Sequence, residues 1–534
     1  MRQDRPRPHR AAGRTRTAPD RPPRPGGRGG APPRRGRRRA HGPGRSPGRS
    51  FGRSFGKSPG RSFGRSPGRS PGRSSGRVPG RRHRRTRRIR ENGGCAVSAT
   101  RRPSEAPGEQ SLPGPWFAFL ESNTTGTGRE FCAAARARGL RPVLLTRDPG
   151  RYPYAAEDGI DTLVLDSADP AAVLDRCAAL ARDGAGLAGV ASSSEYFVAT
   201  AARVATALGL PAADGDALAR CRDKERQREA LAVGGVPVPA FAPAATPEEA
   251  VRAAEEIGHP VVLKPVSGSG SVGVRLCRDS AETLDWAKRL LDRATDERGA
   301  PVGARLLVEA AVRGPEFSVE TFDDTVVTVV AKHTGPEPYF VETGHDVPAP
   351  LPAADTEALG SVALRALTAL GLGWGAAHTE LRLTGTGPVV IEVNPRLAGG
   401  MIPVAVRAAL GTDLVDAVVA RAAGAPPGTR REGGPAAGGG HAAVRFLPAA
   451  REGLVTAVGG LADARTAPGV VAATVATAPG RTVGITHSFQ DRLACVVATG
   501  ADAAQAARRA AAAARLIRIE LEEPAAPEEG DGGR

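Results

Sequence analysis

The positive charge of this chain is confined to its first 102 residues. That segment holds 32 of the 74 Lys and Arg residues but 3 of the 56 Asp and Glu residues, so its net charge is +29 and that of the remainder is −11. From Gly44 to Ser75 it repeats a four-residue unit, GRSP or a close variant, with almost nothing apolar to bury. A segment of this composition repels itself and cannot form a hydrophobic core. We therefore expect residues 1–110 to be a disordered basic tail and the folded part to follow it.

Three interpretations of this tail stay open. Its charge is suited to hold nucleic acid through the release of counterions. It is otherwise an inert linker, or an artefact in which untranslated upstream sequence is read as protein because the start codon was placed too early.

Several classes of protein are excluded by composition. No segment approaches the ~20 consecutive apolar residues that span a membrane, and the first thirty residues lack the apolar region of a secretory signal. The six cysteines are dispersed, with no C-x-x-C pair, which is typical of free thiols in a reducing compartment. We expect a cytoplasmic protein without membrane contact. The sequence leaves the oligomeric state open, a homodimer included.

The region 114–213 alternates apolar runs with helical stretches. This alternation predicts a small parallel α/β domain. The loop Asn123–Gly128 follows the first strand and precedes a helix, where backbone N–H groups favour an anion, although such loops are often simple turns. The expected strands are Trp116–Ser122, Pro142–Thr146, Asp161–Asp166 and Leu187–Ser192, and the expected helices are Arg129–Arg138, Ala171–Arg182 and Glu195–Leu208.

A loop of Gly and Ser marks the region 214–425. The strand Pro260–Lys264 ends in lysine, and the loop after it returns as the strand Val274–Cys277. Gly268, Gly270 and Gly273 satisfy the dinucleotide fingerprint G-x-G-x-x-G, but that motif requires a helix to begin inside it. Because a second strand follows instead, we predict a hairpin whose loop forms a mobile flap over phosphates.

The segment His378–Gly400 predicts two antiparallel strands joined by the turn Thr384–Pro388. Glu380 on the first strand is expected to face Glu392 on the second, and Asn394 lies on the same face as Glu392 because side chains alternate along a strand. Two carboxylates and an amide oxygen form an oxygen-only site suited to Mg²⁺, with Mn²⁺ as an alternative ion. Glu392 lies in the apolar run VVIEVN, where an unpaired carboxylate would be costly.

These motifs resemble the ATP-grasp superfamily. The resemblance lies in the strand lysine with its loop, the E-x-x-V segment Glu309–Val312 and the paired strands ending in E-x-N-P-R. The segments ESNTTGTG, VETGHDVPAP and EVNPRLAGG are similar to bacterial L-amino acid ligases, carboxylate–amine ligases of the bacilysin-synthetase type. The resemblance covers about Pro115 to Arg515. It implies an α/β fold in which an α+β ATP-grasp domain (214–425) follows the N-terminal domain (114–213).

The resemblance also implies how ATP is bound. Lys224 and Lys264 would contact the phosphates. The hinge residues Glu309, Ala310 and Val312 would line the adenine, and Glu316 would hold the ribose hydroxyls. The flap residues implied to cover the nucleotide are Ser267, Gly268, Ser269 and Gly270.

The remaining implied roles concern the metal and the substrates. Glu380, Glu392 and Asn394 match the Mg²⁺ ligands. Arg396 matches the arginine that steadies an acyl phosphate. Glu342 and His345 match residues of the amino-acid pocket, although a lone histidine is as readily structural. The last two implied pocket residues are Gly399 and Gly400.

The predicted function is ATP-dependent formation of an amide bond between a carboxylate, expected to be that of an amino acid, and an amine. The route would be an acyl phosphate, with release of ADP and phosphate. The alternatives are an ATP-grasp carboxylase or formate-dependent transferase of purine metabolism, and a nucleic-acid-associated protein acting through the tail. Residues 440–522 are expected to form a lid subdomain without a catalytic constellation, and 523–534 an acidic frayed end.

Overall fold

The computed structural model describes residues 114–123, 127–295, 299, 303–425 and 440–522. The predicted tail at 1–110, the acidic end at 523–534 and Cys95 lie outside these residues.

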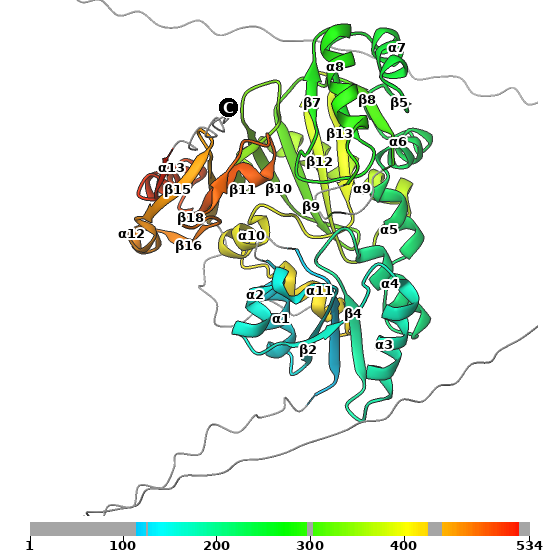
Figure 1. The fold of residues 1–534 in the computed structure, drawn as a ribbon, viewed down its shortest axis with the longest axis vertical. Helices are drawn as coiled ribbons and strands as arrows, with labels where there is room; N and C mark the ends of the chain where they lie inside the picture. Colours follow the sequence, from blue (N-terminus) through cyan, green and yellow to red (C-terminus); the bar gives the residue numbers. More distant parts are fainter. Residues whose placement is uncertain (1–113, 124–126, 296–298, 300–302, 426–439, 523–534) are drawn as a thin grey trace, which may run out of the picture. The chain divides into compact units, whose positions relative to one another are not determined.

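The first described region is a four-stranded parallel sheet with strand order β3-β2-β1-β4 (Figure 1). Its alternation of strands and helices is the one that the sequence predicts. The strands are β1 (Trp116–Leu120), β2 (Arg141–Thr146), β3 (Asp161–Val164) and β4 (Leu187–Ala191). The helices are α1 (Thr127–Ala137), α2 (Pro153–Glu157), α3 (Pro170–Arg182) and α4 (Val198–Ala207), with a 3-10 turn η1 at Pro149–Arg151.

An antiparallel sheet with the order β5-β8-β6-β7 follows. The predicted hairpin is confirmed, because β6 pairs with β7 and Val261 lies opposite Cys277. The glycine loop therefore leads into a strand, and the dinucleotide fold is excluded. The strands are β5 (Phe241–Ala244), β6 (Val261–Pro265), β7 (Arg275–Cys277) and β8 (Leu306–Ala310). The helices are α5 (Gly215–Arg222), α6 (Lys224–Val233), α7 (Pro247–Ile257) and α8 (Ser280–Leu291).

The largest sheet has eight strands in the order β13-β12-β9-β10-β11-β14-β18-β16. It crosses the gap between the predicted domains 214–425 and 440–522, because β11 pairs with β14. Its strands are β9 (Glu316–Phe322), β10 (Thr325–Thr334), β11 (Glu342–Val347), β12 (Ala376–Thr384), β13 (Gly387–Asn394), β14 (His441–Pro448), β16 (Val470–Val475) and β18 (Arg492–Gly500). The helices between these strands are α9 (Ala353–Leu370), α10 (Ile402–Leu410) and α11 (Leu414–Ala422).

The region 440–522 adds a small sheet with the order β17-β15-β19. Its strands are short and partly exposed, so the sequence contains no long apolar run that predicts them. They are β15 (Gly453–Gly459), β17 (Thr482–Val483) and β19 (Arg518–Glu522). This region also contains α12 (Leu461–Thr466), a 3-10 turn η2 (Phe489–Asp491) and the Ala-rich helix α13 (Ala503–Ala514).

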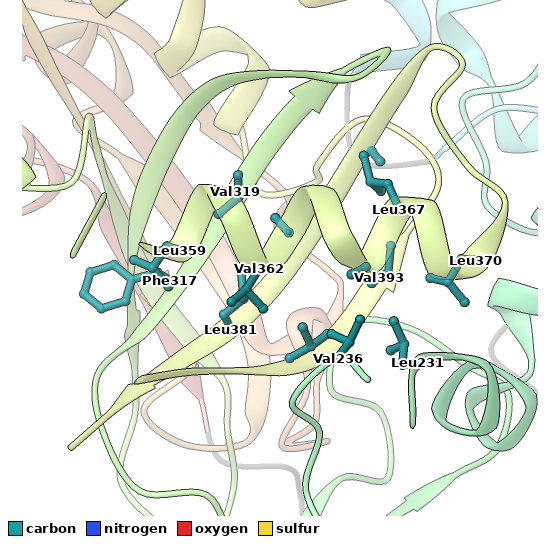
Figure 2. Close-up of a cluster of buried hydrophobic side chains, with 14 of the residues drawn as sticks. Leu231, Val236, Phe317, Val319, Leu359, Val362, Leu367, Leu370, Leu381 and Val393 are labelled. Carbon is teal, nitrogen blue, oxygen red and sulfur yellow. The ribbon is translucent and has the colours of Figure 1, made fainter. Parts of the chain in front are cut away.

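One hydrophobic core fixes the large sheet against its helices (Figure 2). Leu359, Val362 and Leu367 of α9 lie against Leu381 of β12 and Val393 of β13. Leu231 of α6 belongs to the same core. Because Val393 lies between Glu392 and Asn394, this packing holds the predicted metal strand in place.

The expectation of free thiols agrees with the structure. The cysteines in the described residues are free and buried: Cys132, Cys177, Cys221, Cys277 and Cys495. None of the helices in the described ranges combines the length and the apolar character that a membrane crossing requires.

A buried amide joins α6 to β13. Gln227 is fully buried; its Nε2 donates to the carbonyl oxygens of Cys221 and Val393, both at 2.8 Å, and its Oε1 accepts from the Val393 N–H at 2.9 Å. Both backbone groups of Val393 therefore depend on one side chain.

We predict that Gln227→Ala lowers the free energy of unfolding by about 3 kcal/mol, because it leaves buried backbone groups unpaired. Urea denaturation of the full chain measures this. Glu229→Ala, at an exposed position of the same helix, is the control and should change it by less than about 0.5 kcal/mol. Equal values for both variants would contradict the role of Gln227.

Candidate active site

A single cavity of about 880 Å³ gathers the predicted site residues. All of them border it except Ser267, Gly268 and His345. Its walls also include Ser193–Tyr196 after β4, and Phe446, Phe489 and Arg492 from the region 440–522. The site is therefore assembled from every part of the described chain, including the region that was expected to carry no catalytic constellation.

Lys224 links the glycine loop to the metal strand. It is the first residue of α6, whose N-terminus Asp223 caps. Its Nζ lies 2.9 Å from Glu392 Oε1 and donates to the Gly268 carbonyl oxygen at 2.8 Å. The predicted phosphate ligand therefore lies between the flap and a predicted metal ligand.

Lys264 lies in a buried ion triad. Its Nζ is 2.5 Å from Glu309 Oε2, and Arg228 Nε is 2.6 Å from Glu309 Oε1. Burial opposes the charged form of Glu309, but Arg228 and Lys264 hold its pKa below the ordinary value. The Glu309 side chain thus orients Lys264, while Ala310 and Val312 border the cavity.

The two predicted metal carboxylates lie opposite each other, because Glu380 of β12 pairs in register with Glu392 of β13. Asn394 lies opposite His378, one alternation further along. The described residues contain no group of three or more His, Cys, Asp or Glu side chains that would hold a metal ion alone. Two carboxylates and an amide oxygen fit an ion such as Mg²⁺, which takes few protein oxygens and completes its shell with water and phosphate.

Lys332 is the central cation of the site, and the sequence analysis missed it. Its ammonium is almost fully buried and lies 2.9 Å from Glu316, 2.9 Å from Glu342 and 3.0 Å from Glu380. One lysine thus contacts the predicted ribose, substrate and metal carboxylates. It could have been found by the reasoning applied to VVIEVN, because it too is a charge within an apolar run, VVTVVAK.

His378 and Glu320 are a second pair that was missed. His378 Nδ1 lies 2.7 Å from Glu320 and Nε2 lies 3.1 Å from Glu380. Burial alone would lower the pKa of His378, but Glu320 and Glu380 raise it to about 10. The imidazolium orients Glu380. Its position two residues before Glu380, on the same strand face, was the signal in the sequence.

Arg396 and Glu342 also border the cavity. Arg396 Nε donates to Glu195 at 2.9 Å, which ties it to the loop after β4. Glu342 accepts from Arg492 at 2.7 Å, and the Arg492 guanidinium lies 4.2 Å from the centre of the Phe446 ring. Neither Glu195 nor Arg492 was predicted, because both reach the site from distant parts of the sequence.

His345 lies behind the cavity wall. It is fully buried, neither ring nitrogen has a hydrogen-bond partner, and burial lowers its pKa to about 3. Gly400 has φ +58, and a Cβ there would lie 2.7 Å from His345 Nε2. The neutral ring is thus close to the cavity only because residue 400 has no side chain.

The folded architecture agrees with comparisons to known proteins. The profile of the ATP-grasp domain matches residues 257–404, that of the ATP-grasp N-terminal domain 132–212, and that of L-amino acid ligase C-terminal domain 2 residues 445–522. The chain belongs to the ATP-grasp superfamily.

Individual relatives agree with this assignment. The uncharacterized protein y4rH of Sinorhizobium fredii is 37% identical over 380 residues, which are 71% of this chain and 78% of that protein. Alanine–anticapsin ligase of Bacillus subtilis is 28% identical over 233 residues, 40% of this chain and 49% of that enzyme. The crystal structure of L-amino acid ligase from Bacillus licheniformis has the same fold, with a TM-score of 0.64 at 22% identity over 77% of this chain and all of that one. This ATP-grasp protein is thereby classed among the ATP-dependent carboxylate–amine ligases.

We predict that Lys332→Met lowers the free energy of unfolding by about 3–5 kcal/mol at pH 7, because three carboxylates lose their shared cation. The folded-state pKa values of Glu342 and Glu380 lie below their ordinary value of 4.5. The stability gained from Lys332 is therefore complete above pH 4.5 and is lost as the pH falls through the lower folded values.

The difference in the free energy of unfolding between wild type and Lys332→Met should accordingly be largest near pH 7 and should decrease below pH 4.5. Denaturation at several pH values measures this difference. Lys288→Met, at an exposed position of α8, is the control for the loss of a lysine. A difference that does not change with pH would contradict the electrostatic role.

Proposed function

We propose that this ATP-grasp ligase joins the carboxylate of one amino acid to the amine of a second substrate through an acyl phosphate. The observation that carries the proposal is the convergence of Glu380, Glu392, Lys224, Lys264 and Arg396 on one cavity. Paired carboxylates beside two lysines suit the transfer of a phosphoryl group, which asks the protein mainly for positioning and charge neutralisation.

ATP would lie between the sheet β5-β8-β6-β7 and the eight-stranded sheet. The cavity is bordered by Ala310 and Val312 of the hinge, by Glu316, and by the flap residues Ser269 and Gly270. Lys264, held by Glu309, would contact a phosphate oxygen. Glu380, Glu392 and Asn394 would hold Mg²⁺, which would neutralise the charge of the phosphates.

The carboxylate must be activated before an amide bond can form, because a carboxylate is a poor electrophile. A carboxylate oxygen of the first substrate attacks the γ-phosphorus, and ADP leaves. The amine nitrogen of the second substrate then attacks the acyl carbon, phosphate leaves and the nitrogen gives up a proton. Arg396 would stabilise the oxyanion of the tetrahedral intermediate, a contribution of about 3–4 kcal/mol at comparable sites.

The charged residues around Glu342 support an amino acid as one substrate. Glu342 offers an anion for an ammonium group, and Arg492 and Arg396 offer cations for carboxylates or phosphate. The named relative, alanine–anticapsin ligase, supports the same substrate class.

We predict that the products are ADP, phosphate and an amide. A screen of amino-acid pairs for ATP-dependent phosphate release, with mass spectrometry of the products, tests this in the full chain. Release of AMP and pyrophosphate would contradict the acyl-phosphate route.

We predict that Glu392→Gln lowers turnover by more than about 100-fold, because a neutral amide is a poor replacement for a carboxylate that neutralises a divalent cation. Glu357→Gln, at an exposed position of α9, should leave turnover unchanged. Turnover of Glu392→Gln within about tenfold of wild type at saturating Mg²⁺ would exclude the metal role of Glu392.

A further inference from the structure

The glycine loop contacts the region 440–522 at Gly270. The Phe489 N–H donates to the Gly270 carbonyl oxygen at 3.0 Å. The Phe489 ring covers Gly270, so that a Cβ at residue 270 would lie 2.3 Å from the ring. With φ +64 as well, this position accepts only glycine without strain. Both residues border the active-site cavity.

The segment that presents Phe489 is rigid. Asp491 is buried, and its carboxylate accepts from the Thr486 N–H at 2.8 Å and the Thr486 hydroxyl at 2.6 Å. Ser488 is also buried, and its hydroxyl accepts from the Gln490 N–H at 3.2 Å. Phe489 is therefore held by a closed set of hydrogen bonds immediately before β18.

A second contact lies beside the first. The rings of Tyr339 and His487 are stacked with centroids 3.7 Å apart, and the Ser271 hydroxyl donates to the Phe340 carbonyl oxygen at 3.0 Å. His487 and Ser271 have φ of 54° and 63°, a region that non-glycine residues avoid. Strain of this kind persists only where neighbouring contacts outweigh it. Here the strain occurs at one residue of the glycine loop and at one residue of the segment that contacts the loop.

The same segment also contacts the predicted amino-acid pocket. Arg492 follows the turn Phe489–Asp491 and contacts Glu342 at 2.7 Å. The segment Thr486–Arg492 thus contacts the predicted nucleotide flap with one residue and the predicted amino-acid pocket with another.

We propose that Phe489 is a positioning residue that holds the glycine loop Ser267–Gly273 closed over the reacting groups. The inference rests on the proposed function in one respect, namely that an acyl phosphate must be protected from water. Closure of the loop excludes water and favours attack by the amine over hydrolysis. The region 440–522 thereby sets how efficiently ATP consumption is coupled to amide formation.

Hydrogen exchange of the loop, followed by mass spectrometry of the full chain with a non-hydrolysable ATP analogue, tests the contact. Phe489→Ala should speed exchange of Ser267–Gly273 by about tenfold, because the loop opens more often. Gly270→Ala, which places a methyl group against the ring, should do the same, and Phe489→Leu should recover most of the protection. Val471→Ala removes a half-exposed apolar side chain of the same region and should match wild type.

The second measurement is the number of ATP molecules hydrolysed per amide formed, which Phe489→Ala should raise several-fold. Unchanged loop exchange in both Phe489→Ala and Gly270→Ala would overturn the proposal. If Phe489→Ala does not fold, the pair Gly270→Ala and Phe489→Leu decides. If no substrate pair yields an amide but loop exchange responds as expected, the proposed function fails while the positioning role of Phe489 stands.

Discussion

The register between β12 and β13 places two carboxylates opposite each other beneath the cavity, and the surrounding charges depend on it. A buried carboxylate without a counter-charge is costly, so neighbouring strands must supply cations. Cross-strand partners do so directly: Lys332 lies opposite Glu316, and His378 lies opposite Glu320. The face of the large sheet that borders the cavity is therefore an alternating set of acids and bases. A change of register by one residue in β12 would turn His378 away from Glu320 and Glu380 away from Glu392.

The parts of this arrangement that are local in sequence could be predicted. The hairpins β6–β7 and β12–β13 join neighbouring segments through short loops, so alternation and turn residues were enough to place Glu380 opposite Glu392. The contributions of Lys332 and Arg492 could not be placed in the same way. Lys332 becomes a site residue only when β10 lies beside β9, and Arg492 only when β18 reaches Glu342 across 150 positions. His345 is the opposite case. Its local motif predicts a place in the pocket, whereas the fold buries it behind Gly400.

The cavity combines segments that match three different family profiles. Ser193–Tyr196 come from the segment that matches the ATP-grasp N-terminal domain, Lys264 and Glu392 from the ATP-grasp domain, and Phe446 and Arg492 from the L-amino acid ligase C-terminal domain. The predicted metal ligands and the predicted phosphate ligand Lys264 lie in the middle segment, whereas Lys224 precedes it. The arginines and aromatic rings around Glu342 come in part from the last one. Substitutions in residues 445–522 can thus reshape one end of the cavity without touching the paired carboxylates.

The pairing of β11 with β14 has a consequence for synthesis of the chain. β11 ends at Val347, whereas β14 begins at His441, after α9, β12, β13, α10 and α11 have been made. During synthesis from the N-terminus, one edge of the growing sheet keeps its backbone N–H and C=O groups unpaired throughout that interval. Exposed edges of this kind pair readily with strands of other chains. A ribosome that stalls before His441 would therefore release a product prone to aggregate through β11.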